Sequence, residues 1–324
     1  MAIINSVLGP IDSSQLGFTL THEHIAFSPA GFKQTYPQLL NSDRVEEVAV
    51  EQLTRARNEG VETIVDCTTM DLGRDIALME TVSRRSGVQI ICSTGSHLYI
   101  PFGFINTMFE WVVPMSPDEV ASLWVKEIEE GIEDTGIKAG IIKVATNDPI
   151  REPEELMLRS AARTHLQTGV LITTHTPHTS RVGEVQIRIL EEEGVDLSKV
   201  YIGHVNSTLD HDYHKKMMDK GVWLGMDHFF PAGSPGTPSW EDRTAFIKDL
   251  VVDGYEDRIM LAHDWNVMTL ASVESSRANE TYSDGYLWIT RSVLPLLRDL
   301  GVSENAINKL MVENPRRFFE GTSH

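Results

Sequence analysis

The sequence predicts an α/β fold in which eight parallel strands, with helices between them, form a (β/α)8 TIM barrel. From about residue 44 onward, amphipathic segments alternate with short apolar runs, which is the pattern of a parallel sheet. The strand–helix units repeat every 25 to 45 residues or so, a length at which right-handed crossovers can close the sheet on itself. Gly-Val dipeptides recur where most helical patterns end, at Gly60, Gly87, Gly169, Gly194, Gly221 and Gly301.

Each predicted strand is a short apolar run. The runs cover residues 18–24, 62–67, 89–94, 140–145, 170–175, 200–204, 222–226 and 259–264. Glycine tolerates the left-handed conformation that ends a helix, so each Gly-Val dipeptide predicts a helix-to-strand turn. Ser116, Pro117 and Glu119 form a helix-start signal and predict a helix that continues to about Thr135. An open, doubly wound sheet is the alternative arrangement of the same elements.

The 324 residues fit one barrel domain, residues 1–324, because no low-complexity linker or shift in composition divides them. Two stretches rich in polar residues, proline or glycine, 229–240 and 269–284, are expected to form long loops after the seventh and eighth strands. Loops at that end of a barrel surround its mouth.

Composition limits the partners of the protein. The chain has 28 Lys and Arg against 47 Asp and Glu, a net charge of -19, which disfavours nucleic acid and anionic membranes as partners. It has no evident signal peptide and no long uninterrupted apolar window. Cys67 and Cys92 lie in apolar runs and are expected to be buried thiols. These observations predict a cytoplasmic protein.

Six residues of metal-binding type lie at or near the carboxyl ends of predicted strands. They are His22, His24, Lys143, His175, His204 and Asp264. In a parallel barrel these ends converge on one face, so residues far apart in sequence become neighbours. Residues i and i+2 of a strand point the same way, which directs His22 and His24 toward the barrel axis and Glu23 away from it. We therefore expect a metal centre at the carboxyl-terminal face of the strands.

Four imidazoles and a carboxylate suit zinc, with cobalt, manganese and iron as the other candidates. A cationic Lys143 beside a divalent ion would suffer both repulsion and desolvation. Carboxylation of its ε-nitrogen by CO2 would instead give an anionic carbamate whose two oxygens can bridge two metal ions. The sequence therefore predicts a binuclear centre with a carbamylated Lys143.

At these residues the sequence resembles the phosphotriesterase family of the amidohydrolase superfamily, which includes phosphotriesterases and phosphotriesterase-like lactonases. The resemblance covers essentially the whole chain and is carried by residues 9–24, 73–76, 131–146, 173–176, 202–204, 263–265 and 313–319. It implies a (β/α)8 barrel with a binuclear metal centre, and a homodimer. It also implies a division of the ligands: His22, His24 and Asp264 on the buried metal, His175 and His204 on the more exposed one, and carbamylated Lys143 and a hydroxide bridging them.

The sequence departs from the family pattern at two positions. Family members usually have an Asp of a proton relay three residues after the ligand equivalent to His204, where this chain has Ser207. The relay is therefore shortened or rerouted, with Asp210 as a possible substitute. The position after the third strand, Tyr in typical lactonases and Trp in phosphotriesterases, is His97 here. His228 retains the His or Arg that the family has beside the metal pocket.

We expect a hydrolase in which a metal-bridging water attacks a carbonyl or phosphorus centre. Asp264 would accept a proton and pass it outward through His228, or protonate the leaving oxygen. The residues expected to contact substrate are His97, Tyr99, His228, Phe229 and Trp265.

The expected substrate is a small lactone or related ester, because residues 226–259 are compact as in lactonase members. The motifs at 263–265 and 284–286 are closer to the phosphotriesterases, so organophosphate triester hydrolysis is expected as a side activity or, alternatively, as the primary one. The same residues are also compatible with a catalytically silent metal-binding barrel and with a mononuclear deaminase on the same fold.

Overall fold

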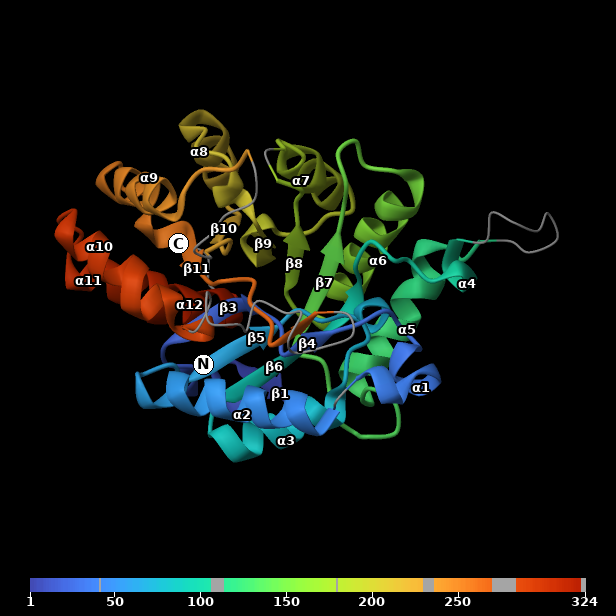
Figure 1. Cartoon of the computed structure of the whole chain (residues 1–324). Helices are drawn as coiled ribbons and strands as arrows, with labels where there is room; N and C mark the ends of the chain where they lie inside the picture. Colours follow the sequence, from blue (N-terminus) through green and yellow to red (C-terminus); the bar gives the residue numbers. More distant parts are fainter. Residues whose placement is uncertain (41, 106–113, 179, 230–235, 270–283, 322–324) are drawn as a thin grey trace.

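All eight predicted strands are present and belong to one parallel sheet. The computed structural model describes residues 1–40, 42–105, 114–178, 180–229, 236–269 and 284–321. The sheet has the order β11-β10-β9-β8-β7-β6-β5-β3, so strands consecutive in the chain are neighbours (Figure 1). The strands are β3 (Thr19–Glu23), β5 (Thr63–Asp66), β6 (Gln89–Ser96), β7 (Ile141–Ala145), β8 (Ile172–His175), β9 (Val200–Ile202), β10 (Trp223–Met226) and β11 (Ile259–Leu261).

The chain after β11 joins the last strand to the first. The Asp264 amide donates to the His22 carbonyl over 3.0 Å, and the His24 amide donates to the Trp265 carbonyl over 2.8 Å. Just beyond, β4 (Ala26–Phe27) and β12 (Met268–Thr269) form a short parallel pair. The sheet is therefore wrapped into a barrel, which confirms the predicted (β/α)8 class and excludes the open sheet.

Helices surround the strands on the outside (Figure 1). They are α1 (Phe32–Thr35), α2 (Ser42–Asn58), α3 (Ile76–Ser86), α4 (Phe102–Ile105), α5 (Pro117–Glu129), α6 (Glu152–Thr168), α7 (Gly183–Glu192), α8 (His211–Asp219), α9 (Trp240–Val252), α10 (Leu294–Asp299), α11 (Glu304–Asn308) and α12 (Asn314–Glu320). Their apolar faces pack on the outward side chains of the strands and form the main hydrophobic core. Within the described residues, no helix is both long and apolar enough to cross a membrane.

Five of the six predicted helix-to-strand turns are confirmed, but Gly301 joins α10 to α11, and one predicted helix boundary is also wrong. All six glycines of the Gly-Val dipeptides have positive φ, from 74° to 102°. The helix that follows Ser116 ends at Glu129, not near Thr135. Gly131 has φ 128° there, and a Cβ on it would lie 2.7 Å from Gly136 Cα. This tight backbone approach, which the local sequence pattern did not reveal, ends the helix early.

A second, smaller core fills the barrel interior. Ile91, Ile141 and Trp223 point inward from three strands and meet Phe318 of α12. A hairpin that we did not predict, β1 (Ile3–Ser6) with β2 (Gly9–Asp12), contributes to the same cluster. Side chains alternate along a strand, so Lys143, two residues after Ile141, also faces the interior. The barrel is thus filled with apolar side chains below its polar site.

Two further predictions concern the long loops and the cysteines. Of the expected long loops at 229–240 and 269–284, residues 230–235 and 270–283 lie outside the described residues. Cys67 and Cys92 are buried free thiols, as predicted.

Candidate metal centre

A β-bulge in β3 sets the direction of the first two candidate ligands. Leu20 is opposite Ile64 and Glu23 is opposite Asp66, so β3 has one residue more than β5 between these pairs. The Thr21 hydroxyl lies 3.3 Å from the hydroxyl of Tyr201, a residue of the interior core. The extra residue lets both Thr21 and His22 face the interior while Glu23 stays on the outer side. The prediction that His22 and His24 point toward the barrel axis therefore holds, and the bulge accounts for the direction of His22.

His22, His24 and Asp264 form a compact group of ligand atoms. One atom from each of the three side chains lies within 4.8 Å of the other two. His24 Nε2 is 3.2 Å from an Asp264 carboxylate oxygen, and His22 Nε2 is 3.9 Å from the same oxygen. His24 Nδ1 is 2.8 Å from the Thr68 hydroxyl. Because Nδ1 contacts Thr68, the other ring nitrogen, Nε2, faces Asp264. This group could hold one metal ion.

His175 and His204 lie beside this group. The His204 ring centroid is 4.5 Å from that of His22 and 4.5 Å from that of His175. Burial holds the pKa of both His175 and His204 well below the ordinary histidine value and lowers that of His22 to about 4. These three imidazoles are therefore neutral at pH 7, which is the form that binds a metal ion.

Lys143 is buried among these histidines. Only 1% of the residue is exposed, and Nζ lies 2.7 Å from His22 Nε2. Burial lowers the pKa of the Lys143 amine, against the opposing effect of Cys67, Asp264 and Asp227. A lowered pKa increases the neutral amine, and this is the form that can react with CO2. The site thus suits the predicted carboxylation chemically.

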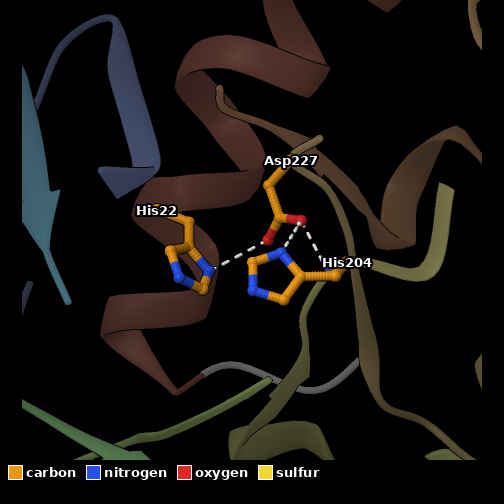
Figure 2. Close-up of side chains that lie close together, drawn as sticks. All are labelled: His22, His204 and Asp227. Atoms are coloured by element: carbon orange, nitrogen blue, oxygen red, sulfur yellow. Dashed lines mark hydrogen bonds and ion pairs between the residues drawn. The ribbon is translucent and has the colours of Figure 1, made fainter. Parts of the chain in front are cut away.

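Asp227 is the main functional residue that the sequence analysis missed. Its carboxylate accepts hydrogen bonds from the His204 amide at 2.6 Å and the Tyr201 hydroxyl at 2.8 Å, and lies 2.9 Å from His204 Nδ1. Its second oxygen lies 3.0 Å from His22 Nδ1 (Figure 2). Burial by itself would raise the pKa of Asp227, but the two histidines hold it well below its usual range. One buried carboxylate thus orients two candidate ligands and leaves their Nε2 atoms facing away from it.

Two glycines make room for this carboxylate. A Cβ on Gly225 would lie 2.5 Å from Asp227 Oδ2, and one on Gly203 would lie 3.2 Å from it. Gly203 precedes His204 in the Ile-Gly-His segment, and Gly225 lies on β10. Asp227 follows β10 directly, so the rule that found the six candidates could have found it as another acid at a strand end.

Glu23 holds the segment that carries Asp264. Its buried carboxylate accepts from the amides of His263 and Trp265, at 2.8 and 2.9 Å, and is 2.6 Å from His263 Nδ1. Asp264, between these two amides, has φ 57°, a left-handed conformation uncommon for a residue other than glycine. Since Glu23 lies on β3 and His263 follows β11, these hydrogen bonds join the first and last strands of the barrel at the site.

His228 connects the metal group to two polar side chains beyond it. Its Nε2 is 3.3 Å from Asp264 Oδ2. Its Nδ1 is 2.8 Å from the Ser207 hydroxyl, which is 3.1 Å from His178 Nδ1. The suggested substitute, Asp210, is not part of this chain of contacts. Its carboxylate accepts from the Tyr213 amide at the start of α8 and from Arg181.

The predicted substrate-contact residues have different surroundings. The ring of His97 lies 4.9 Å from that of His175, and burial lowers its pKa to about 3. Asp71 accepts from the backbone amides of His97 and Tyr99, while 70% of Tyr99 is exposed. Asp71 therefore fixes the segment that presents both side chains.

Phe229 and Trp265 belong to the main hydrophobic core and are only 1% and 2% exposed. Trp265 Nε1 donates to the Gln52 side chain on α2. Their positions serve packing, and their contact with substrate stays a prediction.

Comparison with known proteins assigns the family. Residues 2–319 match the Phosphotriesterase family. The chain belongs to the phosphotriesterase family. It is 37% identical to an aryldialkylphosphatase of Saccharolobus solfataricus over 318 residues, which is 95% of this chain and 96% of the relative. It is 36% identical to a phosphotriesterase homology protein of Mycobacterium tuberculosis over 328 residues, covering 99% and 98% of the two chains.

The fold agrees with this assignment. A solved structure of the phosphotriesterase from Mycobacterium tuberculosis superposes with a TM-score of 0.89 at 35% identity and covers 98% of each chain. Family membership and a barrel of the same shape therefore support the expectation that the polar group at the strand ends is the working site of a hydrolase.

Proposed function

We propose that this phosphotriesterase-family hydrolase uses a binuclear metal centre to open lactones or related esters, with organophosphate triester hydrolysis as a side activity. The observation that carries the proposal is the group of neutral, oriented imidazoles around Lys143 and Asp264. His22, His24 and Asp264 would hold one ion, and His175 and His204 the other. Lys143, carboxylated on Nζ, would bridge them. Zinc is the expected ion, with cobalt, manganese or iron as substitutes.

The donor set fits divalent transition metals. The Nδ1 atoms of His22, His24 and His204 face protein groups, so each ring can present Nε2 to an ion. Divalent cations held there would supply Lewis acidity, which makes a water more acidic and polarises the carbonyl or phosphoryl oxygen of a substrate.

The remaining chemistry comes from residues of the chain. Burial by itself would raise the pKa of Asp264, but His204, His228 and His24 hold it well below its usual range, so the carboxylate is charged at pH 7. Asp264 can therefore accept a proton from attacking water and pass it to His228 Nε2, 3.3 Å away, or return it to the leaving oxygen. His97 and Tyr99 would contact the substrate at the mouth of the barrel, with His228, Phe229 and Trp265 as further predicted contacts.

Three other functions compete with the ester proposal, and one of them, a mononuclear deaminase, is distinguished by the number of bound metal ions. The relative from Saccharolobus solfataricus is named an aryldialkylphosphatase, which favours a primary phosphotriesterase as the second candidate. The third is a barrel that binds metal without catalysing a reaction. A small-molecule substrate, a homodimer and a cytoplasmic location all remain expectations.

The test is a kinetic panel with metal-reconstituted protein. The substrates are acyl-homoserine lactones, γ- and δ-lactones, aryl esters and dialkyl aryl phosphates. We expect a kcat/KM for at least one lactone that exceeds the values for the phosphates. Higher values for the phosphates would favour the primary phosphotriesterase, and no turnover above the free-metal background would overturn the hydrolase proposal.

The Lys143→Ala variant separates catalysis from simple metal binding. An enzyme with a bridging Lys143 should lose bound metal and turnover together, because the bridge is removed. Lys126→Ala is a control, since that lysine is exposed on α5 and pairs only weakly with Glu130 at 3.9 Å. Two metal ions per wild-type chain, and the added mass of one CO2 on Lys143, are expected by elemental analysis and native mass spectrometry. One ion and no added mass would instead favour a mononuclear deaminase.

A further inference from the structure

A line of hydrogen-bonding groups leads from Asp264 to the protein surface. Asp264 Oδ2 is 3.3 Å from His228 Nε2, and His228 Nδ1 is 2.8 Å from Ser207 Oγ. Ser207 Oγ is in turn 3.1 Å from His178 Nδ1. His228 and Ser207 are 2% and 1% exposed, whereas His178 is exposed. The line therefore passes from the polar site through two buried groups to a side chain in contact with solvent.

The barrel topology places these residues side by side. His178 follows β8, Ser207 ends the turn after β9, and His228 follows β10. These strands are consecutive neighbours in the sheet, so their carboxyl-terminal loops are adjacent. The rings of His178 and His228 are also in direct contact, with centroids 4.7 Å apart.

A serine hydroxyl can serve both imidazoles at once. It has one hydrogen to donate and lone pairs to accept, and its hydrogen can rotate between partners. If Ser207 donates to His178 Nδ1, it accepts from His228 Nδ1–H, and His228 Nε2 then presents a lone pair to Asp264. If Ser207 donates to His228 instead, Nε2 carries the hydrogen and donates to Asp264. The hydroxyl orientation and the His228 tautomer are therefore linked.

We propose that His178, acting through the Ser207 hydroxyl, is a positioning residue for His228 and gives its ring a route to solvent. This inference rests on the proposed hydrolase function. A proton on Asp264 moves to His228 Nε2, the proton on His228 Nδ1 moves to Ser207 Oγ, and the hydroxyl proton moves to His178 Nδ1, while the exposed His178 ring releases its Nε2 proton to solvent. One proton returning by the same groups to protonate the leaving oxygen restores the starting tautomer.

The first test compares His178→Ala with wild-type enzyme. We expect kcat to fall about 10-fold, a modest share of what acid–base catalysis contributes, with KM within about two-fold. Added imidazole should restore part of kcat, because His178 is exposed and leaves a space that solvent reaches. His211→Ala is the matched control, since this partly buried histidine packs on Phe246 of α9. An unchanged kcat for His178→Ala, or a rise in KM alone, would contradict the proposal.

The second test asks whether His178 acts through Ser207. Ser207→Ala should lower kcat by a similar factor, and His178→Ala should then have little further effect. Ser207→Asp places a carboxylate beside His228, so His178→Ala in that background should cost less than about two-fold. Equal effects of His178→Ala in all three backgrounds would mean that it acts independently of Ser207.

A third readout does not depend on turnover. In protein labelled with ¹⁵N-histidine, His178→Ala and Ser207→Ala should both shift the tautomer balance of His228, read from its separate Nδ1 and Nε2 signals, while His211→Ala leaves that balance unchanged. If no substrate is hydrolysed but these shifts occur, the proposed function fails and the positioning contact stands. If the enzyme is active and the His228 signals do not respond to His178→Ala, the inference is wrong.

Discussion

At the scale of single residues, Asp227 shows how a buried carboxylate prepares a metal site. It contacts both His22 and His204, which come from β3 and from the end of β9. Because each Nδ1 faces this anion, both rings are held in one orientation before any ion binds. The cost of burying the charge is offset by the hydrogen bonds that it accepts from the His204 amide and Tyr201.

We predict that Asp227→Asn lowers metal affinity by roughly 10- to 100-fold, the usual effect of removing a group that orients metal ligands. The amide keeps one acceptor oxygen but loses the negative charge and places a donor near His22. Competition with a chelator measures the change. Asp253→Asn, at an exposed ion pair with Lys215, is the control, and equal affinities for the two variants would argue against the role.

The residue scale also shows which candidates sequence reasoning could find. The six residues of the predicted metal site lie together because strand ends converge. Ser207 was recognised only as a departure from the family pattern, and its contact with His178 was not foreseen. That contact joins two loops whose relative positions no spacing in the sequence gives.

At the scale of elements, the close approach of β6 to β7 positions Lys143. Gly95 is paired with Lys143 in the ladder and has φ 113°. A Cβ on Gly95 would lie 1.9 Å from the Lys143 carbonyl oxygen. Only glycine fits at this point of β6, so the residue keeps the candidate bridging lysine in place.

Gly95→Ala is therefore expected to destabilise the fold by about 3 kcal/mol or more, from backbone strain together with overpacking. It should also reduce bound metal, since β7 must move. Urea unfolding and elemental analysis measure the two effects. Gly87→Ala is a matched control because φ is 74° there but no atom lies within 4 Å of the added Cβ, and it should cost about 1–2 kcal/mol without loss of metal. Similar losses of stability and metal for both variants would show that the close contact between Gly95 and the Lys143 carbonyl is not the cause.

The start of α5 is an element that local sequence determines almost alone. The Glu119 amide donates to the Ser116 hydroxyl, and the Ser116 amide donates to the Glu119 carboxylate, as the capping-box pattern predicted. The end of the same helix depends instead on the contact between Gly131 and Gly136.

Ser116→Ala should lower the free energy of unfolding by about 1 kcal/mol, because it leaves a helix-terminal amide without its side-chain acceptor. Ser122→Ala, within α5 and exposed, removes only a bond to the Glu119 carbonyl and should change stability little. Thermal or urea unfolding compares the two, and a larger loss for Ser122→Ala would contradict the capping interpretation.

At the scale of the whole molecule, the contacts that close the barrel are the same contacts that position the candidate metal ligands. The Glu23 carboxylate on β3 accepts from backbone amides on both sides of Asp264. The hydroxyl of Tyr286 donates to the His24 carbonyl over 2.6 Å, which ties the chain after residue 283 to the same strand end. Ligands from the first and last strands are thus brought together only when the ring is complete.

The buried histidines make the stability of the metal-free protein depend on pH. Burial lowers the pKa of His22 to about 4 and that of His97 to about 3, while the unfolded chain has histidines near 6.5. Between these values the unfolded chain binds protons that the folded chain does not, so stability falls as pH decreases below about 6.5. These two residues alone should remove roughly 2–3 kcal/mol between pH 7.5 and pH 5.5. Urea unfolding at both pH values tests this, and equal or greater stability at pH 5.5 would contradict it.

The sequence by itself determined the barrel class, the eight strands, the glycine turns and the six candidate ligands. These features follow from side-chain periodicity, from glycine conformation and from the convergence of parallel strand ends, all of which act locally or through topology. Only the tertiary structure decided how Asp227 orients two histidines, how the bulge in β3 aims His22, and that Ser207 leads to His178 rather than to Asp210. Each of these depends on distances of about 3 Å between loops of different strands, and a pattern along one chain does not encode such distances.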